Sequence, residues 1–150
     1  MKIYTLRREQ LIRTPRAELF AFFERPENLA QITPASLGFR ILTPPPIPMH
    51  AGSVIDYTVK LLGLPVRWTT VIAAYEPPHL FVDVSLRGPY SFWHHTHTFD
   101  EVPDGVLITD EVRYALPFGF LGRLIHSLWV RHELKRVFDH RERVIAEMFG

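Results

Sequence analysis

Cysteine is absent from the 150 residues of the sequence. Disulfide bonds, thiolate zinc sites and thiol nucleophiles are therefore excluded, so the fold must rest on a hydrophobic core. An excess of charge of one sign is absent as well, because 17 Lys and Arg residues stand against 16 Asp and Glu residues and leave a formal net charge of +1. This balance predicts that neither nucleic acid nor an anionic lipid surface is a partner.

Long apolar runs are also missing. No run approaches the roughly 18 residues that would indicate a membrane span. The first eight residues lack the apolar stretch of a secretory signal, so a cytoplasmic location is expected. No internal repeat or linker interrupts the chain, and its length fits one ordinary domain. Residues 1–150 are therefore expected to form a single domain.

Two short helices are predicted to follow a first strand over residues 3–12. Thr14 and Pro15 indicate a helix start, because a capping hydroxyl is followed by proline at the first helical position. Pro26 ends this helix, since the residue before a proline avoids the α region. The same proline opens a second short helix that ends near Pro34.

From Leu37 onward the apolar residues recur with a period of two, which predicts strands. A turn at Gly63-Leu64 would place Val59 opposite Trp68 and Tyr57 opposite Thr70. Prolines leave the sheet at 44–48 and again at Pro77-Pro78, because proline donates no ladder hydrogen bond. The strands are expected over residues 37–41, 53–62, 66–75, 80–87, 91–101 and 106–116.

The period returns to 3.6 between Leu121 and Met148, which predicts one helix of about 28 residues that is about 42 Å long. A helix with one apolar side must bury that side against the sheet. The sequence therefore predicts an α+β fold, with a curved antiparallel sheet of about seven strands, two short helices and a long C-terminal helix across the sheet. The expected stripe consists of Leu121, Leu124, Ile125, Leu128, Leu134, Val137, Phe138, Ile145 and Met148.

This order of elements is the helix-grip plan, and the chain resembles the START-like superfamily, also called SRPBCC or polyketide cyclase/dehydrase-like proteins. The resemblance implies a cavity between sheet and helix that binds lipids, polyketides, sterols or hormones. It carries over no catalytic residue, because the superfamily shares no catalytic signature. The residues that carry it are Pro15 to Leu29, Trp68 to Ile72, Gly88-Pro89-Tyr90, Trp93, His95, His97, Phe99, Asp110, Val112, Tyr114, Pro117, Phe138 and Arg141.

The segment from Trp93 to Phe99 is the most informative stretch of the chain. Trp93, His95, His97 and Phe99 share one face of a strand, and the two aromatic ends suggest that this face points inward. With a turn at Asp104-Gly105, His97 would lie opposite Val112 and His95 opposite Tyr114. Asp110 would then be a diagonal neighbour of His97, within reach of a hydrogen bond.

Three interpretations of this inward face remain open. In the first, Asp110 accepts a hydrogen bond from His97 and Tyr114 bonds to His95, and nothing else binds. In the second, these polar groups orient a carbonyl or hydroxyl of a ligand in an apolar pocket. In the third, the His-x-His pair and a carboxylate hold a metal ion. No catalytic residue, metal ion or cofactor is predicted outright.

The expected function is the binding of a hydrophobic or amphipathic small molecule. Asp83 joins the inward face of Trp93 if the resemblance holds, and Tyr57 and Trp68 are expected on the inner face of the sheet. The alternatives are a cyclase, dehydratase or isomerase that uses the same cavity, with His97 as base, and an interaction module with a filled core. A homodimer is possible. The expected ligand-binding residues are Tyr57, Trp68, Asp83, Trp93, His95, His97, Asp110 and Tyr114.

Overall fold

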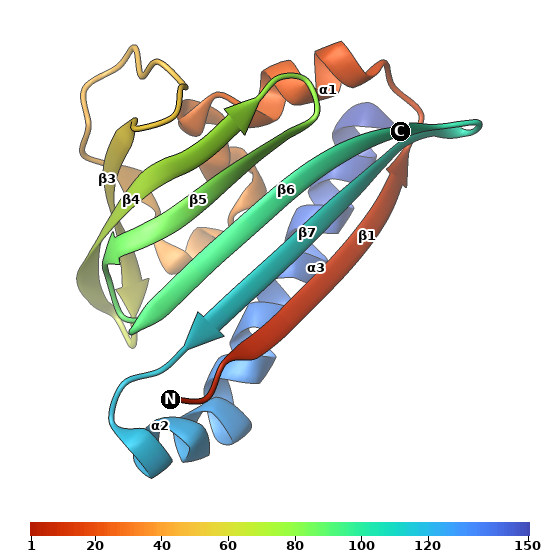
Figure 1. Ribbon diagram of the computed structural model, residues 1–150. Coiled ribbons are helices and arrows are strands. Elements are labelled where there is room, and N and C mark those ends of the chain that lie inside the picture. The colour runs from red at the N-terminus through yellow and green to blue at the C-terminus, as the bar shows by residue number, and fades with distance from the viewer.

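A seven-stranded antiparallel sheet curves around the C-terminal helix in the computed structural model, which describes residues 1–150 (Figure 1). The strand order is β1-β7-β6-β5-β4-β3-β2, so β1 lies at one edge although it comes first in the chain. The predicted α+β helix-grip fold is confirmed. The strands are Tyr4–Ile12 (β1), Arg40–Ile41 (β2), Val54–Leu61 (β3), Leu64–Glu76 (β4), Leu80–Arg87 (β5), Phe92–Val102 (β6) and Gly105–Ala115 (β7).

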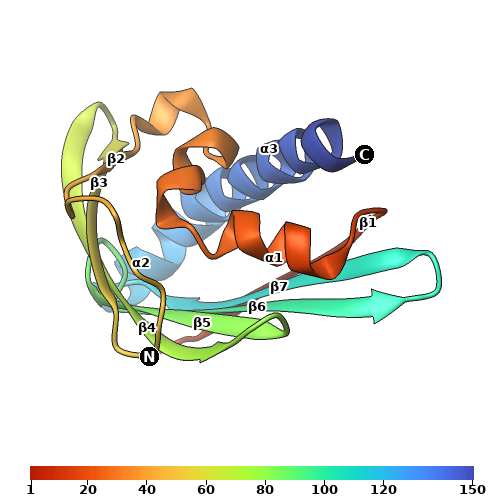
Figure 2. The same cartoon turned by 90° about the horizontal axis from the view of Figure 1, so that it is seen from above.

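All the helices lie on the concave side of the sheet (Figure 2). The N-terminal ones are the α-helix α1 and two short 3₁₀ helices, and the C-terminal helix is continuous but contains one π-helical turn. No helix is both long and apolar enough to cross a membrane. The helices are Arg16–Phe23 (α1), Pro26–Ile32 (η1), Ala35–Leu37 (η2), Gly119–Ile125 (α2), His126–Val130 (η3, the π-helical turn) and Arg131–Phe149 (α3).

The predicted cap of the first helix is wrong. Pro15 occupies the cap position itself, and its carbonyl oxygen accepts hydrogen bonds from the backbone N–H groups of Glu18 and Leu19, both at 3.1 Å. The Thr14 hydroxyl instead donates to the carbonyl oxygen of Phe149, at 2.9 Å. Thr14 therefore joins the start of α1 to the end of α3.

The β3–β4 hairpin turns one residue earlier than expected, at Leu62-Gly63. Both residues have positive φ, 52° and 78°, which is the backbone of a two-residue turn that suits the twist of a hairpin. Tyr57 consequently lies opposite Trp68, and Val59 opposite Val66. The register error is two residues, so the predicted faces are kept.

The β6–β7 register was also predicted wrongly. The turn is at Pro103-Asp104, and Gly105 is already in the ladder, opposite Val102. Gly105 has φ +147°, and a Cβ there would lie 2.4 Å from the carbonyl oxygen of Ile12, so only glycine fits beside β1. As a result, His97 lies directly opposite Asp110, and His95 lies opposite Val112.

The apolar stripe of the C-terminal helix is buried only in its second part. Val130, Leu134, Phe138 and Ile145 are buried, and so is the charged Arg141. The first part of the predicted stripe is exposed, because α2 lies beyond the end of β7 and has no strand beneath it (Figure 1). Leu121, Leu124, Ile125, Leu128 and, at the other end, Met148 are the exposed members.

A cluster of phenylalanines fills the concave side near α1. Phe99 on β6 is 0% exposed and packs against Phe20 and Phe23 of α1, at ring-centroid distances of 5.1 and 5.4 Å. Phe81 on β5 completes the group at 6.2 Å from Phe99. These large side chains leave little free volume at this end of the sheet.

Replacing Phe99 by alanine tests this packing. We expect Phe99→Ala to lower the free energy of unfolding by about 3–5 kcal/mol, because it removes a fully buried ring and leaves a void. Chemical denaturation measures the change. Phe120→Ala is the control: Phe120 is 68% exposed, and its removal should change stability by less than about 0.5 kcal/mol. Equal effects of the two variants would contradict the assignment of the core.

Candidate functional site

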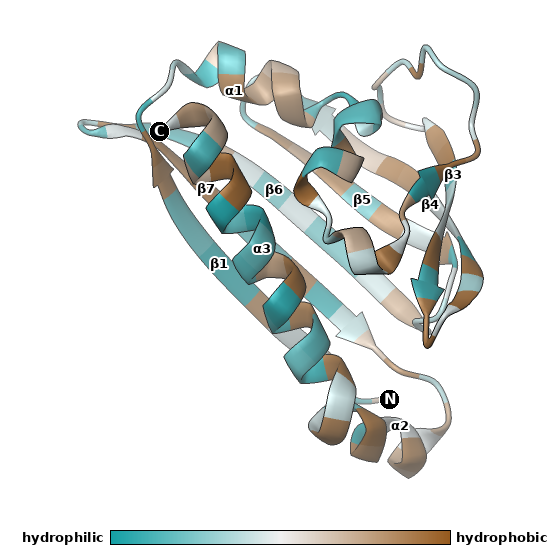
Figure 3. Cartoon of the chain, turned by 180° about the vertical axis from the view of Figure 1, so that it is seen from behind, coloured by the Kyte–Doolittle hydropathy of each residue, from teal (hydrophilic) through white to brown (hydrophobic).

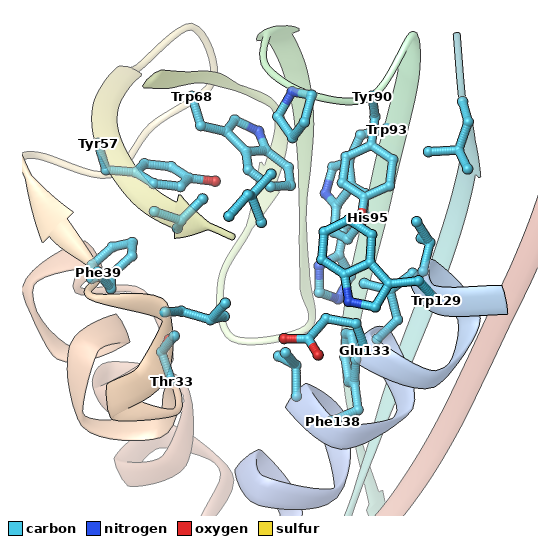
Figure 4. Close-up of a pocket in the computed structure, with 18 of the residues that line it drawn as sticks. Thr33, Phe39, Tyr57, Trp68, Tyr90, Trp93, His95, Trp129, Glu133 and Phe138 are labelled. Carbon is cyan, nitrogen blue, oxygen red and sulfur yellow. The ribbon is translucent and has the colours of Figure 1, made fainter. Parts of the chain in front are cut away.

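A cavity of about 310 Å³ lies between the sheet, the 3₁₀ helices and the C-terminal helix (Figure 4). Its volume is at the lower end of the range for small-molecule pockets. Seventeen of its 26 lining residues are hydrophobic, so most of its wall is apolar. The cavity occupies the part of the concave side that the phenylalanine cluster leaves open.

Six of the eight predicted site residues line this cavity, and two do not. Asp110 lies behind the histidines, to which it is hydrogen-bonded. Tyr114 packs instead against Tyr4 and His126. The six that line the cavity are Tyr57, Trp68, Asp83, Trp93, His95 and His97.

Aromatic rings form the apolar wall on the sheet. Trp68 is central to it, because it stacks on Tyr57 with a centroid distance of 5.7 Å and meets Trp93 edge-on at 5.1 Å. Tyr90, in the loop between β5 and β6, packs on Trp93 at 4.8 Å. Sequence reasoning missed Tyr90 as a lining residue, although its position beside Gly88-Pro89, within the quoted family motif, was an available signal.

The opposite wall comes from the helices, as the resemblance implied, but none of its residues was among the predicted ligand-binding residues. Figure 4 shows Phe138, Glu133 and Trp129 of the C-terminal helix facing the sheet across the cavity. Phe39, which precedes β2, closes a further side and packs on Tyr57 at 5.0 Å. Of these residues, the helical period pointed only to Phe138, and to it only as a core position.

Two histidine–aspartate pairs form a polar cluster at one end of the cavity. His97 Nε2 lies 2.6 Å from Asp83 Oδ2, and His95 Nε2 lies 2.8 Å from Asp110 Oδ1. The two imidazole rings stack on each other with centroids 3.6 Å apart. The closest carboxylate to His97 is thus Asp83 of β5, whereas the sequence predicted Asp110, whose Oδ1 is 3.3 Å from His97 Nδ1.

Arg141 of α3 adds a positive charge to the same cluster. Its Nη1 lies 3.9 Å from Asp110 Oδ1, and its guanidinium lies over the ring of Phe138 at 5.0 Å. The residue is only 9% exposed and lines the cavity, and its Nε is buried without a hydrogen-bond partner. The cluster therefore contains a buried donor that a ligand can satisfy.

The charges of the cluster balance if the histidine pair holds one proton. Burial disfavours every charged form here, but the histidines lower the pKa of both Asp83 and Asp110, so both carboxylates are ionised. Burial and the neighbouring His97 lower the pKa of His95. Burial also opposes charge on His97, yet its bonds to Asp110 and Asp83 outweigh it and raise its pKa. His97 is therefore the histidine that holds a proton more strongly, and when protonated it neutralises the two carboxylates together with Arg141.

Tyr114 belongs to a separate polar pair. Its hydroxyl lies 2.6 Å from His126 Nε2, and Tyr4 stacks on the His126 ring at 3.5 Å. The predicted bond between Tyr114 and His95 is wrong, because the true register places Trp93 opposite Tyr114. Burial raises the pKa of Tyr114 to about 12, so its hydroxyl stays protonated near neutral pH.

The same cluster has the composition of a metal site. One ligand atom each from Asp83, His95 and His97 lies within 4.8 Å of the others, which is the two-histidine, one-carboxylate combination. Asp110 would hold His95 from behind, as outer carboxylates do around metal-bound histidines. The short bond between Asp83 and His97 would have to open to admit an ion.

Comparisons with known proteins identify the fold. No family profile matches the sequence, and no curated protein matches it either. A protein of Chromobacterium violaceum has a solved structure with a TM-score of 0.74 and 13% identity over 97% of both chains. A second, the protein TTHA0849 of Thermus thermophilus, has a TM-score of 0.73 and 14% identity over 98% of this chain and 100% of the other.

A plant protein shares the fold too. The ginseng major latex-like protein 151 of Panax ginseng has a TM-score of 0.71 and 14% identity, over 99% of this chain and 98% of its own. At these identities the likeness is one of fold alone. The predicted helix-grip fold is thereby confirmed along the whole chain.

The two histidines should titrate in separate steps. We expect His97 to keep its proton above pH 6.5 and His95 to lose its proton below that value, as followed by NMR of the ring nitrogens. Because the pKa of His97 is raised on folding, its charge stabilises the fold at low pH, and this contribution is lost as the pH rises through the folded pKa. Asp83→Asn should lower the pKa of His97.

Asp100→Asn is the matched control, since Asp100 is exposed on β6 and makes no contact with the cluster. It should leave both titrations unchanged. A pKa of His95 above that of His97 would contradict the proton assignment.

Proposed function

We propose that the protein binds a hydrophobic or amphipathic small molecule, such as a lipid or a polyketide, in the cavity beneath the C-terminal helix. The observation that carries this proposal is that the cavity is mostly apolar and has a cluster of charged residues at one end. The apolar part of the ligand would lie against Trp68, Trp93 and Phe138. Its polar group would meet His97 and Arg141.

The apolar wall supports binding energetically. Each Å² of apolar surface removed from water contributes about 25 cal/mol, so a ligand that buries about 200 Å² gains about 5 kcal/mol before any polar contact. The wall on the sheet contains aromatic rings that pack on one another, so these side chains lose little freedom on binding. The site would therefore select by size and apolar surface.

The charged end supports selection of the polar group. Arg141 Nε has no partner within the protein, and His97 is the positively charged member of its pair. Arg141 Nε is a donor, so the ligand would present an acceptor, namely a carbonyl, hydroxyl or carboxylate oxygen. His97 would add positive charge rather than a hydrogen bond, because both of its ring nitrogens already face carboxylates. A purely hydrocarbon ligand would leave the buried donor unsatisfied.

A cyclase, dehydratase or isomerase is the second candidate function. The lowered pKa of His95 favours it, because Asp110 orients the ring through Nε2 while Nδ1, 3.7 Å from Asp83 Oδ2, makes no hydrogen bond and would accept a proton. The base would then be His95 rather than His97, which was the predicted base. Enzymatic turnover would require a substrate with an acidic C–H or O–H group near the histidine pair.

Filling the cavity should abolish binding. Val137 lines the cavity from α3, and Val137→Phe adds a ring to that volume. We expect the affinity for anilinonaphthalene sulfonate, a probe with apolar rings and one anionic group, to fall by about tenfold or more. Fluorescence titration measures it, and thermal unfolding checks that the variant is folded.

Val54→Phe provides the same change outside the cavity, because Val54 is 48% exposed on β3 and does not line it. This control should bind the probe as the unmodified protein does. If Val137→Phe folds and binds with unchanged affinity, the cavity is not the binding site.

A further inference from the structure

The largest apolar side chains of α2, of its cap residue Phe118 and of η3 are exposed to solvent. Phe118 and Leu128 are 77% and 71% exposed. In Figure 3 this end of the helix is coloured largely as hydrophobic, and no strand lies beneath it. Soluble surfaces rarely expose so many large apolar residues together unless something covers them. The set comprises Phe118, Phe120, Leu121, Leu124, Ile125, Leu128 and Trp129, and we call it the helical apolar face.

A second apolar feature lies at the same end of the molecule. The turn of the β3–β4 hairpin carries Leu62 and Leu64, which are 85% and 68% exposed. Figures 1 and 3 both place this hairpin turn toward the end at which α2 lies. The cavity connects the two features, since its lining includes Leu61 next to the turn and Phe118, Ile125 and Trp129 of the helical apolar face. Both features thus border the same end of the cavity, which we call its mouth.

The charges at this end are all positive. Residues 57–75, 84–99 and 112–132, which contain the hairpin, the β5–β6 loop and the helical apolar face, include no Asp or Glu. The near-neutral net charge of the chain conceals this segregation. Six exposed cations in or beside these segments form no ion pair, namely Lys2, Lys60, Arg87, Arg113, Arg123 and Arg131. The next acid along the chain, Glu133, is hydrogen-bonded by Arg136.

We propose that this end of the protein docks on an anionic lipid bilayer. An amphipathic helix that carries Trp, Phe and Leu on one side and Arg beside them is the usual element that lies in a membrane interface. The cations would meet the anionic headgroups, while the helical apolar face and the hairpin leucines enter the acyl boundary. The near-zero net charge of the whole sequence predicted no such partner. Net charge does not show that the cations and acids, although nearly equal in number, lie in different parts of the molecule.

A second copy of the chain fits this surface less well. A two-fold dimer would place the same patch against itself, so that the unpaired cations would face cations across the contact. A bilayer has the opposite charge and needs no shape complementarity. The distribution of charge therefore favours an anionic lipid surface over a second copy of the chain as the partner.

Docking in this orientation would turn the cavity mouth toward the acyl chains. If the proposed binding function is correct, an apolar ligand could enter the cavity from the bilayer without crossing water. The docking itself does not depend on that function, because Leu124 and Leu128 lie outside the cavity lining.

Vesicle co-sedimentation tests the proposal. We expect the full chain to bind vesicles of phosphatidylcholine with about a third phosphatidylglycerol, to bind pure phosphatidylcholine much more weakly, and to be released by salt. The double variant Leu124→Glu/Leu128→Glu should bind the anionic vesicles about tenfold or more weakly. Arg123→Glu should weaken binding about fivefold or more.

Two controls separate this surface from general charge effects. Met148→Glu adds a charge at an exposed apolar residue at the far end of α3, and Arg143→Glu reverses an exposed charge there. Both should bind vesicles nearly as the unmodified protein does. Absence of binding by the unmodified chain at low salt, or equal binding by the double variant, would overturn the proposal.

Two further readouts keep the outcomes distinct. A concentration-dependent dimer in analytical ultracentrifugation that the double variant abolishes, without vesicle binding, would overturn the proposal in favour of a second copy. The double variant should keep its affinity for anilinonaphthalene sulfonate. Loss of vesicle binding with retained probe binding thus assigns docking to this face, whereas failure of probe binding in the unmodified chain refutes the proposed function alone.

Discussion

The pairing of buried charges across β5, β6, β7 and α3 is the constraint on which the rest of the structure depends. Asp83, His95, His97 and Asp110 come from three adjacent strands, and Arg141 comes from the helix that crosses them. Ions buried at this depth are tolerated only when each has partners, so the helix must keep its position over the strands. The same requirement fixes the β6–β7 register, because a one-residue slip would turn the histidines to the outer face. The cluster is thus both a structural link and the charged end of the cavity.

The concave side of the sheet is divided between two kinds of packing. Around Phe99, rings from the sheet and from α1 interdigitate and fill the space, as stable cores require. Around Trp68 and Trp93, the rings pack edge to face along the sheet and leave space below the helix. The charged cluster lies between these regions, since His97 stacks on Phe81 and His95 contacts Trp93 and Phe138. The cavity is therefore a defined part of the fold rather than a packing defect.

The sequence was sufficient for the order of elements, because the change of period from two to 3.6 is unambiguous at Leu121. It was not sufficient for the partner of His97, since Asp83 comes from β5, and no sequence signal indicates the β5–β6 register that places Asp83 opposite His95 and beside His97. Both hairpin registers were missed for a local reason: Leu62 takes positive φ, and Gly105 belongs to a strand. The exposure of the first part of the C-terminal helix was not predicted, because the apolar period identifies the apolar side of a helix but does not show whether another element covers that side. The sequence also could not show whether the aromatic residues fill the core or surround a cavity, because this depends on how they pack in three dimensions.

Native mass spectrometry tests the central claim most directly, namely that the cavity holds an amphipathic organic molecule. The protein would be incubated with a total lipid extract, desalted gently and weighed intact, then weighed again after denaturation. The account predicts an excess mass that disappears on denaturation, that fragments as an organic compound and that is absent from Val137→Phe. An intact mass equal to that of the polypeptide, or an excess that corresponds to a metal ion, would contradict it.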